Sequence, residues 1–157
     1  MPQEEKHGTR SLTYSAWHRS KSICRFVTEE TALTLAMIDV DHVLYCEYDN
    51  ESKEPIALIE EAKDIGQEVK AGTVTQALAR RAGLPALVVL WKEDARHLNP
   101  ADENWPDLLS LRVKRLWPVP ESQWKKLTPQ EWADCLVRMR TWQADKLDEL
   151  IFGKRST

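Results

Sequence analysis

An unbroken apolar segment, residues 84–91 (LPALVVLW), constrains the fold more than any other feature of the chain. It has the length of one strand, and its composition suits a strand that is buried on both faces. Such a strand needs other elements on both sides of its sheet, which predicts an α/β protein. Residues 74–82 before it carry apolar residues at helical intervals and end at Gly83, which favours helix termination. Thr73 and Gln76 have capping-box spacing at the start of that helix.

Two further strand-like segments precede the predicted helix. Residues 41–48 are rich in β-branched and aromatic residues, and residues 56–61 resume an apolar run after a polar turn at 49–55. The short connection predicts an antiparallel hairpin. Together with the helix and the strand at 84–91, the element order is β-β-α-β. We therefore predict an α/β fold with a single mixed β-sheet and flanking helices.

The C-terminal third predicts one more strand and a long helix. Residues 111–117 alternate between apolar and polar and stop at Pro118, as expected for a half-buried edge strand. Signals for a helix N-terminus follow at Thr128, Pro129 and Glu131. The long C-terminal helix is expected over residues 128–152. Its apolar stripe should be buried against the domain or a second subunit, and consists of Trp132, Leu136, Met139, Trp142, Leu147 and Leu150.

Length and composition fit a single domain over residues 1–157, with its core at about 12–117 and the C-terminal helix added to it. A hydrophobic content of 42% and a charged content of 30% argue against general disorder. No apolar run is long enough to span a membrane. The polar residues 1–10 do not resemble a secretory signal, so the expected location is cytoplasmic.

The charged residues are unevenly distributed along the chain. The net charge is −3, yet residues 28–68 contain twelve Asp and Glu residues and only two Lys residues, between two mildly basic segments. The simpler interpretation is a solvated acidic face, which charge alone favours. The alternative is a metal site flanked by surfaces that contact phosphates.

Acidic residues occur where the two predicted hairpin strands meet. Asp39 and Asp41 stand at the start of the first strand, and Glu60, Glu61 and Lys63 stand at the end of the second. These ends are neighbours in an antiparallel hairpin. Carboxylates from adjacent strands can bind Mg²⁺ or Mn²⁺, and a lysine beside them can position water or offset charge on a phosphate.

At these residues the chain resembles the PD-(D/E)XK, or restriction-endonuclease-like, nuclease superfamily. Its signature is an aspartate that opens one hairpin strand and Glu-x-Lys on the next, within a ββαβ core. Residues 15–19 (SAWHR), 38–41 (IDVD) and 56–60 (IALIE) also look like a set of short phage and bacterial proteins. The resemblance covers roughly residues 12–92.

The resemblance implies a divalent-metal-dependent nuclease that hydrolyses phosphodiester bonds in nucleic acid, with DNA as the expected substrate and a phage or prophage as the expected source. Mg²⁺ or Mn²⁺ would be the cofactor, and a homodimer is one assembly that it allows. The implied metal ligands are Asp39, Asp41, Glu60 and Glu61. The implied catalytic residues are Asp41, Glu60, Glu61 and Lys63.

Strand alternation leaves two assignments of the family glutamate open. If it is Glu60, the lysine position holds Ala62; if it is Glu61, Lys63 fits but the opposite face of the strand carries the site. A bulge at the strand end would present both glutamates. Ala62 also motivates the alternative function, a catalytically silent binding or regulatory protein, such as a phage effector that engages a host protein through its acidic face.

A second cluster, Trp17, His18 and Arg19, is the candidate nucleic-acid-binding segment. Arg19, with Lys21 and Arg25 nearby, has the chemistry of a phosphate clamp. His18 has a reference pKa near neutrality and so suits proton transfer. The equally favoured alternative is an amphipathic segment that buries Trp17 and leaves His18 and Arg19 in solvent.

Overall fold

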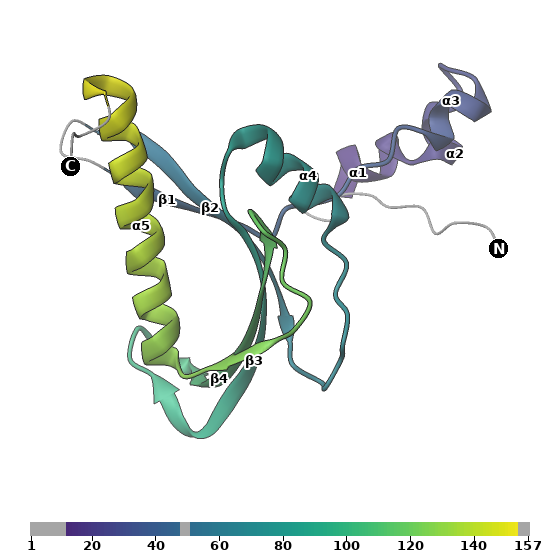
Figure 1. Cartoon of the computed structure of the whole chain (residues 1–157). Helices are drawn as coiled ribbons and strands as arrows, with labels where there is room; N and C mark the ends of the chain where they lie inside the picture. Colours follow the sequence, from purple (N-terminus) through teal and green to yellow (C-terminus); the bar gives the residue numbers. More distant parts are fainter. Residues whose placement is uncertain (1–11, 48–50, 154–157) are drawn as a thin grey trace. The chain divides into compact units, whose positions relative to one another are not determined.

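The computed structural model describes residues 12–47 and 51–153. The chain divides into two compact units, residues 1–40 and 41–157, and each is described by itself. The larger unit holds the β-sheet and the two longest helices (Figure 1). The prediction of one domain for the whole chain stays a prediction.

Five strands form one mixed sheet in the order β1-β2-β3-β4-β5. The parallel pair is β2 with β3, and every other neighbouring pair is antiparallel. The α/β fold with a single mixed sheet is therefore confirmed, including the β-β-α-β order at its centre. The strand bounds are His42–Glu47 (β1), Lys53–Lys63 (β2), Ala86–Asn99 (β3), Asp102–Trp117 (β4) and Lys125–Leu127 (β5).

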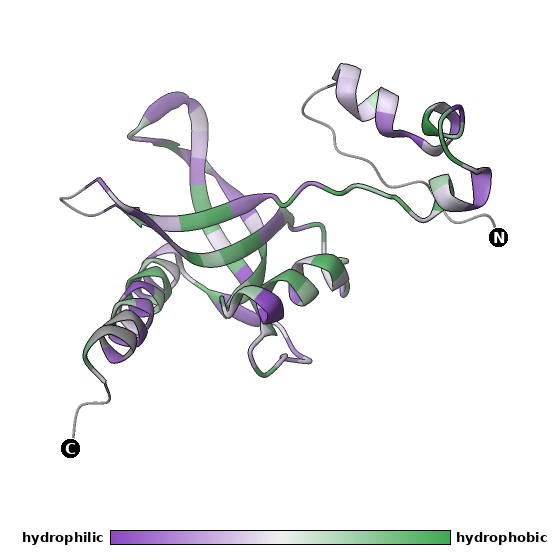
Figure 2. Cartoon of the chain, turned by 90° about the horizontal axis from the view of Figure 1, so that it is seen from above, coloured by the Kyte–Doolittle hydropathy of each residue, from purple (hydrophilic) through white to green (hydrophobic). Residues whose placement is uncertain are grey.

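Residues 86–91 of the apolar segment form the first part of β3, and side chains on both faces of this strand are buried as predicted, whereas Leu84 and Pro85 precede the strand. Val88 and Leu90 are buried on one face, and Val89 is buried on the other with Leu111 and Val113 of β4. Hydrophobic residues concentrate in the strands, whereas the outer end of the β3–β4 hairpin is hydrophilic (Figure 2).

Helices α4 (Thr73–Ala82) and α5 (Pro129–Phe152) cover opposite faces of the sheet. Gly83 ends α4 with a φ of 69°, a left-handed conformation that glycine adopts easily. The capping box predicted for Thr73 is wrong, because Gly72 is the N-cap and Gln76 donates to the Leu116 carbonyl instead. The N-terminal signals predicted for α5 are confirmed, with Thr128 as N-cap and Glu131 completing a capping box.

Strand 111–117 is not an edge strand. The three-residue β5 pairs with it on one side and β3 on the other, and the polar segment expected as a loop extends β3 and β4 into a long hairpin. In α5, Trp132, Leu136 and Met139 are half-buried, while Trp142 remains exposed. Asp49 and Asn50 of the predicted turn lie outside the described residues, as do the side chains of Leu147 and Leu150.

The described part of the N-terminal unit contains three short helices, α1 (Leu12–His18), α2 (Ser20–Ile23) and α3 (Glu29–Leu33). Buried residues in this described part include Ser15, Ile23 and Ala32. No helix in the described part of the chain is long and apolar enough to cross a membrane.

Candidate functional site

The hairpin brings Asp41 and Glu60 together at the edge of the sheet. His42 of β1 pairs with Ile59 of β2, so the preceding residue, Asp41, reaches the level of Glu60. Asp41 Oδ2 accepts a hydrogen bond of 2.9 Å from the backbone N–H of Glu61, which fixes the aspartate against β2. The Glu60 side chain is only 6% exposed and accepts a hydrogen bond from the Thr75 hydroxyl of α4.

A lysine that the sequence analysis did not select lies between these carboxylates. Lys70 Nζ is 3.7 Å from Asp41 Oδ2 and 3.8 Å from Glu60 Oε2. Its side chain is 23% exposed, so it is largely withdrawn from solvent. One carboxylate oxygen from Asp41, just before β1, and one from Glu60 of β2 therefore converge on one cationic group.

The connection from β2 to α4, residues 64–72, carries Lys70 and is held in place by β4 and the segment after it. Arg112 makes two hydrogen bonds to the Asp64 carboxylate, at 2.9 and 2.7 Å, and a third to the carbonyl of Gln67 at 2.8 Å. The Trp124 indole donates to the carbonyl of Glu68 at 2.9 Å. These contacts fix the path of the chain that leads to Lys70.

The environment separates the proton affinities of the two carboxyl groups. Burial raises the pKa of Glu60; its hydrogen bond from Thr75 opposes the rise, and the neighbouring Asp41 carboxyl adds to it. Burial would also raise the pKa of Asp41, but the Glu61 N–H, the hydrogen bond with Glu60 and the charge of Lys70 lower it overall. Glu60 is therefore the member of the pair that holds a proton more readily.

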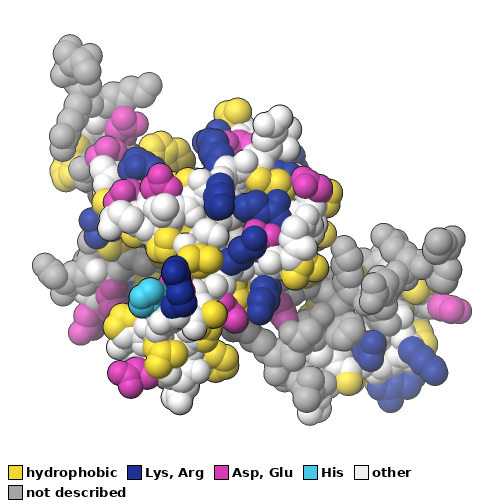
Figure 3. All heavy atoms as spheres, turned by 90° about the horizontal axis from the view of Figure 1, so that it is seen from below, with side chains coloured by type: hydrophobic (Ala, Val, Ile, Leu, Met, Phe, Trp, Pro, Cys, Tyr) yellow, Lys and Arg dark blue, Asp and Glu magenta, His cyan; other side chains and the backbone are white. Residues whose placement is uncertain are grey.

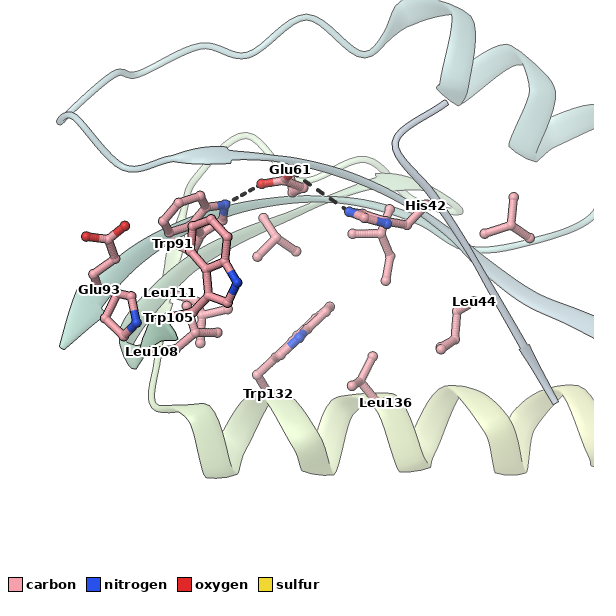
Figure 4. A pocket seen from close by; sticks show the side chains of 14 residues that line it. His42, Leu44, Glu61, Trp91, Glu93, Trp105, Leu108, Leu111, Trp132 and Leu136 are labelled. Atoms are coloured by element: carbon pink, nitrogen blue, oxygen red, sulfur yellow. Dashed lines mark hydrogen bonds and ion pairs between the residues drawn. The ribbon is translucent and has the colours of Figure 1, made fainter. Parts of the chain in front are cut away.

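Glu61 faces the opposite side of the sheet. Its carboxylate accepts a hydrogen bond from the Trp91 indole, and its other oxygen lies 3.9 Å from Nε2 of His42 (Figure 4). Lys63 forms an ion pair of 3.5 Å with Glu93 rather than with either site carboxylate. The structure thus groups Asp41 with Glu60 and Lys70, and separates Glu61 and Lys63 from them.

The cluster Trp17–His18–Arg19 lies in the N-terminal unit. Arg19 lines a concave surface of about 460 Å³ together with Lys21 and Arg25, the three residues proposed as a phosphate clamp. Trp17 is 46% exposed, which argues against the alternative in which it is buried. His18 Nε2 lies 2.6 Å from the carbonyl oxygen of Leu35, and this hydrogen bond links α1 to the segment after α3. Asp39 also belongs to this unit, and its predicted role as a metal ligand stays a prediction.

Lys70 and Thr75 are the two site residues that the sequence analysis missed. Lys70 is in a polar connection without any regular spacing to Glu60. Thr75 lies in the helix predicted over residues 74–82, but the sequence of that helix does not indicate which strand it packs against. Among the residues that the structure describes, no three His, Cys, Asp or Glu side chains are grouped as a metal site.

Comparisons of the chain with protein-family models, with curated proteins and with solved structures find no match.

Proposed function

We propose that this protein is a divalent-metal-dependent nuclease of the PD-(D/E)XK type, with Asp41, Glu60 and Lys70 at its active centre and DNA as its substrate. One observation carries the proposal: the carboxylates of Asp41 and Glu60 converge on a single cation position, which the Lys70 ammonium now occupies. A cytoplasmic location is part of the proposal, because DNA and Mg²⁺ are both present there.

The two carboxylates suit Mg²⁺ or Mn²⁺. Mg²⁺ is usually held by one or two carboxylates, keeps several waters and takes further oxygens from a substrate phosphate. Asp41 and Glu60 supply that number of ligands, and the flexible stem of Lys70 allows its ammonium to move aside. A bound divalent ion would polarise the phosphate and lower the pKa of a bound water.

The chain's own residues have separate roles in the proposed hydrolysis. In the reaction, a water oxygen forms a bond to phosphorus, the ester P–O bond breaks, and the leaving oxygen takes up a proton. Lys70 is placed to donate hydrogen bonds to the phosphate oxygens as negative charge builds up on them. It would replace the family lysine, whose position two residues after Glu60 is occupied by Ala62.

Charge on the surface supports a role for the N-terminal unit in holding the nucleic acid. Arg19, Lys21 and Arg25 share one concave surface, and guanidinium groups match phosphate oxygens well. On the face of the larger unit drawn in Figure 3, basic and acidic side chains are interspersed rather than gathered into one basic patch. We therefore assign phosphate contact to Arg19 and its neighbours.

The test is cleavage of single-stranded and duplex DNA by the full chain with Mg²⁺ or Mn²⁺. The parent should cleave, and chelation of the metal should stop it. Asp41→Asn and Lys70→Met should each reduce the rate by about a hundredfold or more. Asp134→Asn and Lys63→Met are matched controls that remove the same charges elsewhere. Equal loss in the controls would contradict the assignment of the site.

A second candidate function is favoured by the same ion pair. Lys70 already offsets one of the two carboxylate charges, and Glu60 holds a proton more readily than Asp41, so the cluster can exist without a metal, as expected of a silent binding protein that engages a host protein. Calorimetric titration with Mn²⁺ separates the two candidates. The nuclease binds the ion with measurable heat and loses that heat in Asp41→Asn, whereas the silent protein shows no heat in either form.

A further inference from the structure

A large cavity lies on the face of the sheet opposite to Asp41 and Glu60, between the strands and α5. Its volume is about 610 Å³, within the range of small-molecule sites. Figure 4 shows Trp132 and Leu136 pointing from α5 toward the sheet, with Glu61 and His42 across from them. The polar and aromatic groups that line it are His42, Glu61, Trp91, Glu93, Trp105 and Trp132.

The cavity combines three indole rings with negative charge. Among the described residues that line the cavity, Glu61 and Glu93 are the carboxylates, and none is Lys or Arg. The Trp91 indole N–H orients the Glu61 carboxylate without neutralising it, and His42, 3.9 Å from the other Glu61 oxygen, is 59% exposed and offsets the charge only when protonated. Lys63, which pairs with Glu93 at 3.5 Å, has a side chain that is 58% exposed, so solvent weakens its effect on the cavity.

This chemistry selects for one kind of ligand. The faces of indole rings attract cations, and the attraction is strongest for organic cations that lose their water easily. Carboxylates at the same place add Coulomb attraction for a cation and repel phosphates and other anions. An apolar wall favours alkyl groups around the charge.

We propose that this cavity is a binding site for a small organic cation that carries a quaternary or alkylated ammonium group. The proposal goes beyond the nuclease function and does not depend on it, because Glu60 and Glu61 face opposite sides of β2. A ligand here would rest on Trp105, which is 66% exposed and open to solvent, and on Trp132 from the helix.

The probe is choline, compared with dimethylbutanol, its neutral carbon isostere. Binding to the full chain is followed through the indole N–H resonances of Trp91, Trp105 and Trp132, assigned by substitution. Choline should shift these resonances and bind about tenfold more tightly than the alcohol, because only choline gains the cation–π and carboxylate terms. Equal affinity for both probes, or no shift with choline, would overturn the proposal.

Two variants locate the site. Glu61→Gln keeps an acceptor for the Trp91 indole but removes the charge, and should weaken choline binding about tenfold. Trp105→Ala changes an exposed residue, so it keeps the test valid if Glu61→Gln does not fold, and should weaken binding several-fold. Glu47→Gln removes one exposed charge at the other end of β1 and should bind choline as the parent does. Tighter binding of a neutral nucleoside than of choline would also overturn the proposal.

Discussion

Glu60 and Glu61 are neighbours with the same side chain, yet the two faces of β2 give them different chemistry. Glu60 is buried with a carboxylate, an ammonium and a hydroxyl group around it. Glu61 is half-exposed and lies among indole and imidazole rings. The difference shows how alternation along one strand separates an ionic site from an aromatic cavity within a single peptide bond.

The largest expected change in stability is that of Lys70→Met, compared with removal of Lys63 on the other face of the sheet. Lys70→Met leaves the buried Glu60 carboxylate facing the half-buried Asp41 carboxylate without a cation between them, and should lower the free energy of unfolding by about 3 kcal/mol. Lys63→Met breaks an exposed ion pair and should cost less than about 1 kcal/mol. Urea denaturation at neutral pH measures both.

Added Mg²⁺ sharpens this comparison. In Lys70→Met the ion should restore part of the lost stability, because it replaces the missing positive charge between Asp41 and Glu60. In Lys63→Met it should have no such effect. Equal costs for the two lysine variants would show that the faces do not differ as described.

A smaller effect is expected from the tryptophans of the aromatic cavity. Trp132 packs against the core formed by Val89, Leu111 and Val113, so Trp132→Ala should cost about 2 kcal/mol, less than for a fully buried tryptophan. Trp105→Ala should leave thermal stability nearly unchanged because the side chain is exposed. Thermal unfolding of both variants checks this. An unchanged melting temperature in Trp132→Ala would mean that α5 does not stabilise the sheet.

The smallest effect concerns pH. The folded state raises the pKa of Glu60 above its ordinary value of 4.5, so the stability this group contributes is present below pH 4.5 and is lost as the pH rises through the folded pKa. Glu60→Gln should therefore flatten the decline in stability between pH 4.5 and neutrality. Denaturation curves at several pH values measure the slope.

Asp64, in the connection that follows β2, has a pKa shift opposite in direction to that of Glu60. Hydrogen bonds from Arg112 hold the pKa of Asp64 well below its ordinary value of 3.8. Its contribution to stability is present above pH 3.8 and is lost as the pH falls toward the folded pKa. Asp64→Asn should reduce acid sensitivity without changing the slope above pH 4.5. An identical pH profile in the two variants would contradict the assigned directions.

The sequence was sufficient for the elements whose signals are local. The strand within 84–91 and the N-cap of α5 at Thr128 depend on composition and capping within a few residues. The cap was predicted correctly, and the strand begins at Ala86, two residues later than predicted. Strand β5 was missed because three residues carry no periodicity. The outer part of the β3–β4 hairpin was missed because its residues are polar and pair mainly with one another.

The site was only partly predictable for a different physical reason. The hairpin brings Asp41 to Glu60, and that pairing follows from antiparallel register. The choice between Glu60 and Glu61 depends on which face α4 covers, which strand alternation alone does not specify. The position of Lys70 depends on contacts that the segment from β2 to α4 makes with Arg112 and Trp124. Both residues are more than forty positions away in the sequence.

The most direct test of the central claim is Mn²⁺ binding, measured by calorimetry, in the neighbouring variants Glu60→Gln and Glu61→Gln. Both substitutions remove one charge from the same strand, so they differ only in the face that they change. Glu60→Gln should weaken Mn²⁺ binding by about tenfold or more, while Glu61→Gln should bind Mn²⁺ as the parent does. Loss of binding in Glu61→Gln with normal binding in Glu60→Gln, or no Mn²⁺ binding by the parent, would contradict the account.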